Sequence, residues 1–334
     1  FSRQGFHFDS GASFYCGLAD PNSVNPLRQV LAVLGEAIAA VPYDPFGHYH
    51  FPDATLPIYS NSEKYRAAIS ALRNSEGTAE ISPNGAKELA ALEKRFLQLY
   101  EGLRGIPTLA LRSDWKLVSV LLTRYFPALL KMLPNLPLTQ ASVGDLVDET
   151  VKDPWVRRLI DLECFLLSGL KAEGTIAPEM AFMFGERTNS VIDYPIGGGA
   201  AIVDALVRGL KKWGGELRLN AHVEKILVES GKVQGVKLRS GEVLKAPIVI
   251  SNASIWDTYS QLLDPEVVPE SERQAALKTP TVDSFMHLHL GIRADGLDGL
   301  TGHHVVVHST ERDITEPGNT CMISIPSVWD ANLA

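Results

Sequence analysis

Alternating histidines are the residues of this sequence whose types and spacing could do chemistry. His48 and His50 lie two positions apart, and His287 and His289 repeat that spacing. Alternate residues of a strand share a face, so either pair could begin a metal site. Such a site needs three or four converging ligands, which nothing near the first pair supplies, and unligated histidines on half-buried strands are common. We therefore predict strand histidines and no metal.

The sequence offers no convincing residues for acid–base or nucleophilic catalysis. It contains neither the serine elbow GxSxG nor the zinc motif HExxH. Glu173, Glu186 and Arg187 are charged residues near the exit of a helical region, and we interpret them as solvated surface. The catalytic residues are therefore unknown from the sequence.

A glycine turn, Gly197 to Gly199, opens the stretch around which the chain is organised, residues 193–257. Apolar residues at helical spacing follow over 200–213, and Gly214-Gly215 ends that helix because glycine adopts the left-handed conformation of a C-terminal cap. Beyond it we predict a strand at 216–219, a hairpin of 222–229 and 232–238, a strand at 242–246 and a buried strand at 248–250. No GxGxxG follows a strand anywhere, so the turn is not the dinucleotide-binding fingerprint.

Helices are predicted for most of the region between residue 66 and Met183. They include helices at 85–102, 117–133 and 156–170. An earlier helix is predicted at 25–40, with Asn25 as its N-cap and Pro26 at its first position. The segment 117–133 is the most apolar, yet it is too short and too charged to span a bilayer. It is either core or a helix on a membrane surface, and we favour core. Further strands are predicted at 6–8, 285–292 and 305–307.

The composition limits the class of protein. A chain of 334 residues with 45% hydrophobic and 21% charged residues is globular and long enough for two domains. The net charge of -8, without a basic run longer than a pair, argues against a nucleic-acid partner. The three cysteines, Cys16, Cys164 and Cys321, form no CxxC, which argues against disulfides and thiolate metal sites and favours a reducing compartment.

Two motifs carry a resemblance to a known family. The pattern of glycine turn, helix, GGxLxLNxxVxxI, GxVxGVxLxxG and VISNAS, ending at Ser254, resembles the second lobe of the FAD-binding domain in two-dinucleotide-binding flavoproteins. The similarity is strongest to the phytoene desaturase and carotenoid (prolycopene) isomerase branch. A second match is GFHFDSGAS over residues 5–13, with Ala12 where that family has proline.

The resemblance implies a cofactor, FAD, and the residues that bind it. The backbone of Val223 would meet the adenine end, and the loop of Asp9, Ser10 and Gly11 would lie beside the flavin. The remaining cofactor-binding residues implied by the match are Gly197, Gly198 and Asn252.

The implied fold class is α/β. It is a two-dinucleotide-binding-type FAD domain, incomplete because its first βαβ is missing, with an inserted substrate domain of mixed helices and strands. Residues 1–20 and 190–256 would belong to the FAD-binding domain, and residues 21–189 and 257–334 to a substrate-binding domain truncated at its C-terminal part. The chain begins with Phe1 rather than methionine, so we interpret it as an internal fragment of a longer protein.

The implied function is that of an FAD-dependent oxidoreductase or isomerase that desaturates carotenoid-like polyenes or isomerises their double bonds. Its partner would be a lipophilic polyene, with peripheral membrane contact and no nucleic acid. Two alternatives stay open, a retinol-saturase-like reductase and a non-catalytic remnant that binds lipid or protein partners. Without the fingerprint amides, these residues alone are expected to hold little flavin and to be inactive. The plastid is the expected location, and no targeting segment is recognised.

Overall fold

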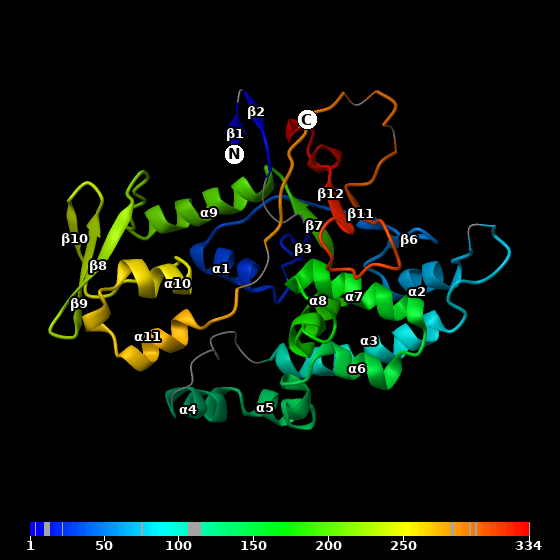
Figure 1. The fold of residues 1–334 in the computed structure, drawn as a ribbon, viewed down its shortest axis with the longest axis horizontal. Coiled ribbons are helices and arrows are strands. Elements are labelled where there is room, and N and C mark those ends of the chain that lie inside the picture. Colours follow the sequence, from blue (N-terminus) through cyan, green and yellow to red (C-terminus); the bar gives the residue numbers. More distant parts are fainter. Residues whose placement is uncertain are drawn as a thin grey trace. The chain divides into compact units, whose positions relative to one another are not determined.

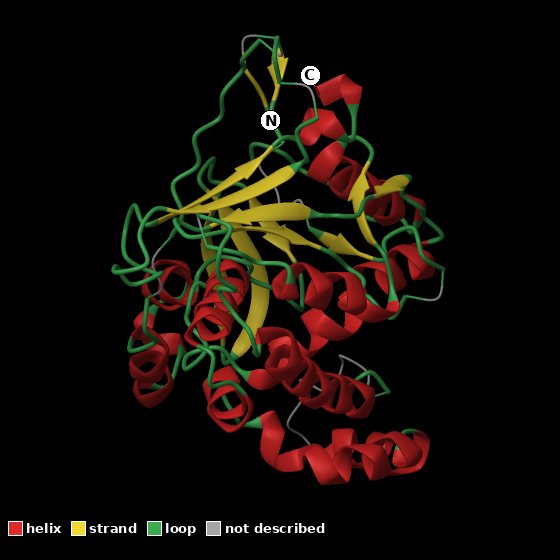
Figure 2. Cartoon of the chain, turned by 90° about the vertical axis from the view of Figure 1, so that its right-hand side faces the viewer, coloured by secondary structure: helices red, strands yellow, loops and turns green. Residues whose placement is uncertain are grey.

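The computed structural model describes the whole chain except residues 4, 10–13, 22, 75, 106–114, 282–283, 294, 298 and 334. Two units divide it: Phe1–Trp213 together with His287–Ala334 form the larger, and Gly214–Met286 forms the smaller. The helices contain more residues than the strands, which are short (Figure 2).

Helices build the core of the larger unit (Figure 1). The helices of the larger unit are α1 (Pro26–Leu34), α2 (Ser62–Ser70), α3 (Gly85–Leu103), α4 (Trp115–Arg124), α5 (Phe126–Met132), α6 (Val143–Thr150), α7 (Pro154–Ser168), α8 (Ala177–Asn189) and α9 (Gly198–Lys212). Of these, α2, α3, α5, α6, α7 and α8 contribute buried side chains to that core. The central helix is α3, which packs on α2, α5, α6, α7 and α8. Leu89, Leu92, Phe96 and Leu99 are fully buried on it, as their spacing predicts.

The strands of the larger unit form two small sheets and a ribbon. Their members are β1 (Ser2–Arg3), β2 (Phe6–His7), β3 (Tyr15–Cys16), β4 (Ala40–Pro42), β5 (Gly47–His50), β6 (Thr55–Ile58), β7 (Ile192–Pro195), β11 (His303–Val307) and β12 (Thr320–Ser324). The sheet orders are β3-β7-β4 and β12-β11-β5-β6, and β11 runs parallel to β5. One face of the second sheet packs against the helical core through the side chains of Tyr49, Leu56 and Val305. The strand predicted at 305–307 is confirmed.

The smaller unit contains the predicted meander. It consists of β8 (Val223–Glu229), β9 (Lys232–Leu238) and β10 (Val243–Lys245), followed by α10 (Ile255–Asp257) and α11 (Glu270–Leu277). Ser230 and Gly231 both have positive φ, 47° and 72°, the conformation that a two-residue type I′ hairpin turn requires. Lys225 of β8 forms an ion pair with Asp264 at 2.6 Å and ties the meander to the turn before α11.

Three predicted strands are wrong. Residues 216–219, 248–250 and 285–292 belong to no strand among the described residues. Ile250, predicted to be buried, is 90% exposed. A strand needs hydrogen bonds to a neighbouring strand, whereas an apolar alternation specifies only which side chains share a face. None of these segments has such a neighbour within the described part of the chain.

The predicted helix at 117–133 is also corrected. It divides into α4 and α5 at Tyr125, because Pro127 favours a helix start and disfavours an interior. The preference for core was wrong, since α4 has no buried residue. Among the described helices, no single one is long and apolar enough to cross a membrane. Together, α4 and the segment Phe126–Thr139 meet the length and composition needed, with a bend of 97° between them.

Asn25 caps α1 as predicted, and its removal is expected to destabilise the protein. Its Oδ1 accepts hydrogen bonds from the backbone N–H groups of Leu27 (2.9 Å) and Arg28 (3.4 Å). Asn25→Ala should therefore lower the unfolding free energy by about 1 kcal/mol in urea denaturation. Asn84 occupies the same position before α3 without a side-chain cap. Equal losses for Asn84→Ala and Asn25→Ala would contradict the capping explanation.

Candidate cofactor site

The glycine turn before α9 begins the candidate site. Gly197 and Gly198 both have left-handed backbones, with φ of 88° and 63°, and Gly197 has no side chain with which to cap the helix. Two distant carboxylates take its place. Oδ2 of Asp330 accepts the N–H of Gly197 at 2.8 Å, and Oδ1 of Asp9 accepts the N–H of Gly199 at 3.2 Å. Both carboxylates lie where the positive end of the helix dipole stabilises negative charge.

Asp9 also joins the turn to β7. The phenol of Tyr194, which is fully buried, donates to Asp9 Oδ2 at 2.6 Å. Burial, reinforced by the hydrogen bond to Asp9, raises the pKa of Tyr194, so the phenol stays neutral and remains a donor. A Cβ at Gly198 would lie 2.6 Å from Asp9 Oδ2 and 3.0 Å from the Tyr194 oxygen. Only glycine therefore permits this approach.

Aromatic rings pack behind the turn. The indole of Trp329 stacks on Tyr194 with centroids 4.7 Å apart, and it lies 4.6 Å from both Tyr43 and His303. A Cβ at Gly302 would lie 1.7 Å from the indole, so this position requires glycine. Because Asp330 follows Trp329 directly, the rings hold the carboxylate against the glycine turn.

His303 is a buried, neutral member of this cluster. Its Nδ1 lies 3.0 Å from the carbonyl oxygen of Phe46, which only accepts, so Nδ1 carries the proton. Burial lowers the pKa of His303 to about 4. Its ring also stacks on Phe14 with centroids 4.0 Å apart. At neutral pH the imidazole is therefore an uncharged part of the packing.

Asp193 anchors the N-terminal segment to β7. Its side chain is fully buried and accepts hydrogen bonds from the backbone N–H groups of Leu18 (3.3 Å) and Ala19 (2.9 Å). Burial raises the pKa of Asp193, although these hydrogen bonds oppose the shift. The segment that carries Asp9 is thus fixed to the strand that leads into the glycine turn.

The structure brings together part of the predicted site. Asp9, Gly197 and Gly198 converge at the start of α9. Ser10 and Gly11 lie outside the described residues. Val223, half-buried, begins β8 opposite Leu238, and Asn252 is exposed in a loop, both in the smaller unit.

Sequence reasoning missed Tyr194, His303, Trp329 and Asp330 as members of this cluster. Tyr194 lies only three residues before Gly197, so its closeness in sequence to the glycine turn could have identified it as a site residue. The other three lie more than a hundred residues from the turn, and no local pattern links them to it.

Only part of FAD fits this cluster. A pyrophosphate at a helix N-terminus needs backbone amides that are open to it. Here the amides of Gly197 and Gly199 already donate to Asp330 and Asp9, whose negative charges would repel phosphate oxygens. Carboxylates instead accept hydrogen bonds from hydroxyl and N–H groups. The cluster therefore suits the ribityl chain or the ring edge of a flavin and does not suit its pyrophosphate.

Arg187 and Glu186, interpreted from the sequence as surface, are buried in the helical core. The guanidinium of Arg187 lies 3.2 Å from the carboxylate of Glu163, and both side chains are at most 4% exposed. Tyr65 donates to the same carboxylate at 3.0 Å and also stacks under Arg187. The surface interpretation failed because buried ion pairs leave no periodic signal. Glu173 is exposed, as predicted.

Glu186 connects the core to the N-terminal segment. It accepts a hydrogen bond from Tyr100 at 2.5 Å and one from Ser23 at 3.2 Å. Burial and this hydrogen bond raise the pKa of Tyr100. Because Ser23 lies just before α1, the network couples α3 and α8 to the segment that leads from the candidate site.

Histidines gather on the outer face of the sheet β12-β11-β5-β6. His48 and His50 share that face as predicted, and His304 of β11 joins them with its Nδ1 3.0 Å from Nε2 of His50. His304 Nε2 lies 3.1 Å from the carbonyl oxygen of Thr301, so Nε2 carries the proton and Nδ1 accepts from His50. Within the described residues, no group of histidine, cysteine or acidic side chains has a geometry that could hold a metal ion.

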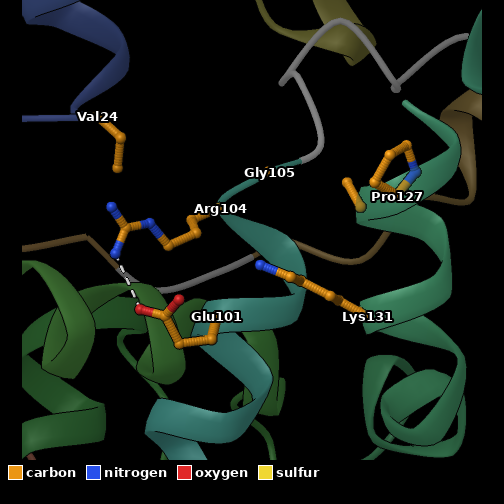
Figure 3. Close-up of a pocket in the computed structure, with 7 residues that line it drawn as sticks. Val24, Glu101, Arg104, Gly105, Pro127 and Lys131 are labelled. Carbon is orange, nitrogen blue, oxygen red and sulfur yellow. Dashed lines mark hydrogen bonds and ion pairs between the residues drawn. The ribbon is translucent and has the colours of Figure 1, made fainter. Parts of the chain in front are cut away.

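Two cavities lie outside the candidate cofactor site. The larger, of about 500 Å³, is lined by Val24, Glu101, Arg104, Gly105, Pro127, Ala128 and Lys131. Figure 3 shows Arg104 paired with Glu101 and Lys131 reaching from α5 toward the end of α3. The smaller, of about 250 Å³, lies among charged residues that include Arg157, Lys171 and Asp313. Neither cavity contains a predicted cofactor residue.

Comparison with known proteins gives a family match over nearly the whole chain. The family model described as flavin containing amine oxidoreductase matches residues 1–322. A chloroplastic prolycopene isomerase of Daucus carota is 29% identical over 335 residues, which cover 100% of this chain and 52% of that protein.

Two further relatives agree with this match. The chloroplastic prolycopene isomerase 1 of an Oncidium hybrid cultivar is 31% identical over 338 residues, with coverage of 100% and 55%. A neurosporene-forming phytoene desaturase of Cereibacter sphaeroides is 30% identical over 274 residues, with coverage of 78% and 46%. The chain spans about half the length of the curated relatives it matches.

Proposed function

Because the chain belongs to the family of flavin containing amine oxidoreductases, we propose that the protein is an FAD-dependent enzyme that acts on a carotenoid-like polyene. The observation that carries this proposal is the match of the entire chain to relatives named prolycopene isomerase. Phytoene desaturases match most of the chain as well. The reaction is therefore cis–trans isomerisation or desaturation of a conjugated chain.

The finer architecture proposed is that of the two-dinucleotide-binding flavoproteins. Residues 1–20 and 190–256 would contribute to the FAD-binding domain, and residues 21–189 and 257–334 to the substrate-binding domain. The predicted meander β8-β9-β10 supports the proposal, since it follows α9 in the order that the resemblance implies.

FAD supplies the redox chemistry when it is bound, as donor or acceptor of hydride. We propose that the Asp9 carboxylate accepts hydrogen bonds from the ribityl chain or the ring edge, beside the backbone of Gly197 and Gly198. Tyr194 fixes that carboxylate through its own hydrogen bond. Val223 is proposed for the adenine end and Asn252 as a further cofactor-binding residue, with Ser10 and Gly11 in the loop beside the flavin.

The chemistry of a polyene substrate indicates where in the cell the protein acts. A hydrocarbon chain has almost no hydrogen-bonding groups, so its recognition depends on shape and apolar burial. Such a molecule dissolves in lipid, and we therefore propose peripheral contact with a membrane. The names of the matching plant relatives include chloroplastic, and we propose the plastid as the compartment.

The product mass distinguishes the reactions. Full-length protein reconstituted with FAD and given a poly-cis carotene should yield a product of unchanged mass if it isomerises the substrate. The loss of two hydrogens identifies a desaturase, and their gain identifies a saturase. No product from protein that retains flavin would contradict the proposed substrate class. If the purified protein retained no flavin after reconstitution, this result would contradict the proposal of an FAD-dependent enzyme. It would favour a non-catalytic binding role.

A further inference from the structure

An exposed apolar surface lies along α4 and α5. Its side chains are between 50% and 75% exposed, and they are Trp115, Val118, Leu122, Phe126, Leu130 and Leu133. Isolated apolar residues are ordinary on protein surfaces, whereas a contiguous set marks a site of interaction. We refer to this set as the α4–α5 surface.

The spacing of these residues gives each segment one apolar face. Trp115, Val118 and Leu122 follow helical periodicity along α4, and the other three repeat it from α5 into the following turn. Met132 is buried on the other side of α5, with its sulfur 3.1 Å from where a Cβ on Gly102 of α3 would lie. The helix is thus anchored to the core by one face while its opposite face is exposed.

The charged residues within the two segments have one sign. Lys116, Arg124 and Lys131 lie within residues 115–139, which contain no aspartate or glutamate. Arg104 lines the cavity next to Lys131, where it is paired with Glu101 of α3 (Figure 3). Apolar side chains flanked by cations are typical of helices that lie in the interface of a bilayer containing anionic lipids.

We propose that the α4–α5 surface binds the interface of a lipid bilayer that contains anionic lipids. The 97° bend between the two segments suits side chains that enter one leaflet rather than a continuous helix that crosses it. A second copy of the chain fits less well, because a symmetric contact would bring Lys116, Arg124 and Lys131 of both copies together, and residues 115–139 contain no acidic partner for them. The inference rests on the proposed membrane contact and on no part of the flavin chemistry.

Vesicle binding tests this surface directly. The full chain should cosediment with vesicles of phosphatidylcholine and phosphatidylglycerol, and more weakly with phosphatidylcholine alone. Replacing Lys116, Arg124 and Lys131 by glutamine should weaken partition to the anionic vesicles roughly fivefold per cation removed. Val118→Glu with Leu122→Glu should abolish binding to both kinds of vesicle. Brominated lipid should quench part of the tryptophan fluorescence of the parent protein. This quenching should be smaller in Trp115→Phe.

The matched control carries the same change on another exposed helix face. Val30 and Val33 of α1 are also exposed, and Val30→Glu with Val33→Glu should leave vesicle binding unchanged. Circular dichroism and urea denaturation should match the parent protein for all variants, since the replaced side chains are exposed. Equal partition of the parent and the Val118/Leu122 variant would overturn the proposal. So would self-association that this variant abolishes. Flavin content and turnover, measured separately, test the proposed function.

Discussion

Replacing Arg187 by methionine is expected to lower the unfolding free energy by about 3–5 kcal/mol, because it leaves the buried carboxylate of Glu163 without its cation. The pair is 3.2 Å apart and almost without solvent contact. Arg187 also stacks on Phe184, with 4.2 Å from the guanidinium carbon to the ring centre. Methionine fills much of the volume and removes the charge. Urea denaturation measures the loss as a lower transition midpoint.

An exposed ion pair provides the control. Arg218 forms an ion pair with Glu242 on the surface through two contacts of 3.0 Å, and Arg218→Met should lower the unfolding free energy far less than Arg187→Met does. Adding Glu163→Gln to Arg187→Met should recover part of the stability, because glutamine is uncharged. If Arg187→Met lowered the unfolding free energy no more than Arg218→Met, the buried pair would contribute no more to stability than an exposed one.

Acidification is expected to destabilise the larger unit through His303. Burial lowers its pKa from 6.5 to about 4, so the unfolded chain binds the proton more tightly than the folded chain. The stability from this residue is complete above the unfolded pKa and is lost as the pH falls toward the folded value. The difference is about 2 kcal/mol between neutral pH and about pH 5. Urea midpoints measured across this range test it.

His303→Asn isolates the contribution of this imidazole. Asparagine can still donate to the Phe46 carbonyl and does not titrate, so the variant should be less stable at neutral pH and less sensitive to acid. Some acid sensitivity should remain, because burial also lowers the pKa of His48 and of His50. An unchanged pH dependence in His303→Asn would refute the assignment.

Helices with a buried apolar stripe could be predicted from the sequence. The helical spacing of four apolar residues predicts α3, namely Leu89, Leu92, Phe96 and Leu99. The preference of asparagine for the N-cap position predicts the start of α1 at Asn25. The turn at Ser230-Gly231 also follows local rules. Each of these features depends on residues within a few positions of one another, which explains the agreement.

Features that depend on distant partners could not be predicted. Ile250 has the pattern of a buried strand residue, yet no ladder partner pairs with it among the described residues. Arg187 is polar by type and buried because α7 brings Glu163 to it. At the candidate site, Asp9 and the glycine turn were expected through resemblance. Asp330 reaches the same turn only after the chain has folded.

Because two different carboxylates bind the glycine turn, two of its backbone amides report independently on the docking of two segments. The amide of Gly199 is held by Asp9 and the amide of Gly197 by Asp330, so each records the docking of a different segment. If one segment detaches transiently, only its own amide becomes available to solvent deuterium. Exchange at Gly197 and at Gly199 would then rank the two segments by their opening free energies, and would show which segment a bound flavin holds in place.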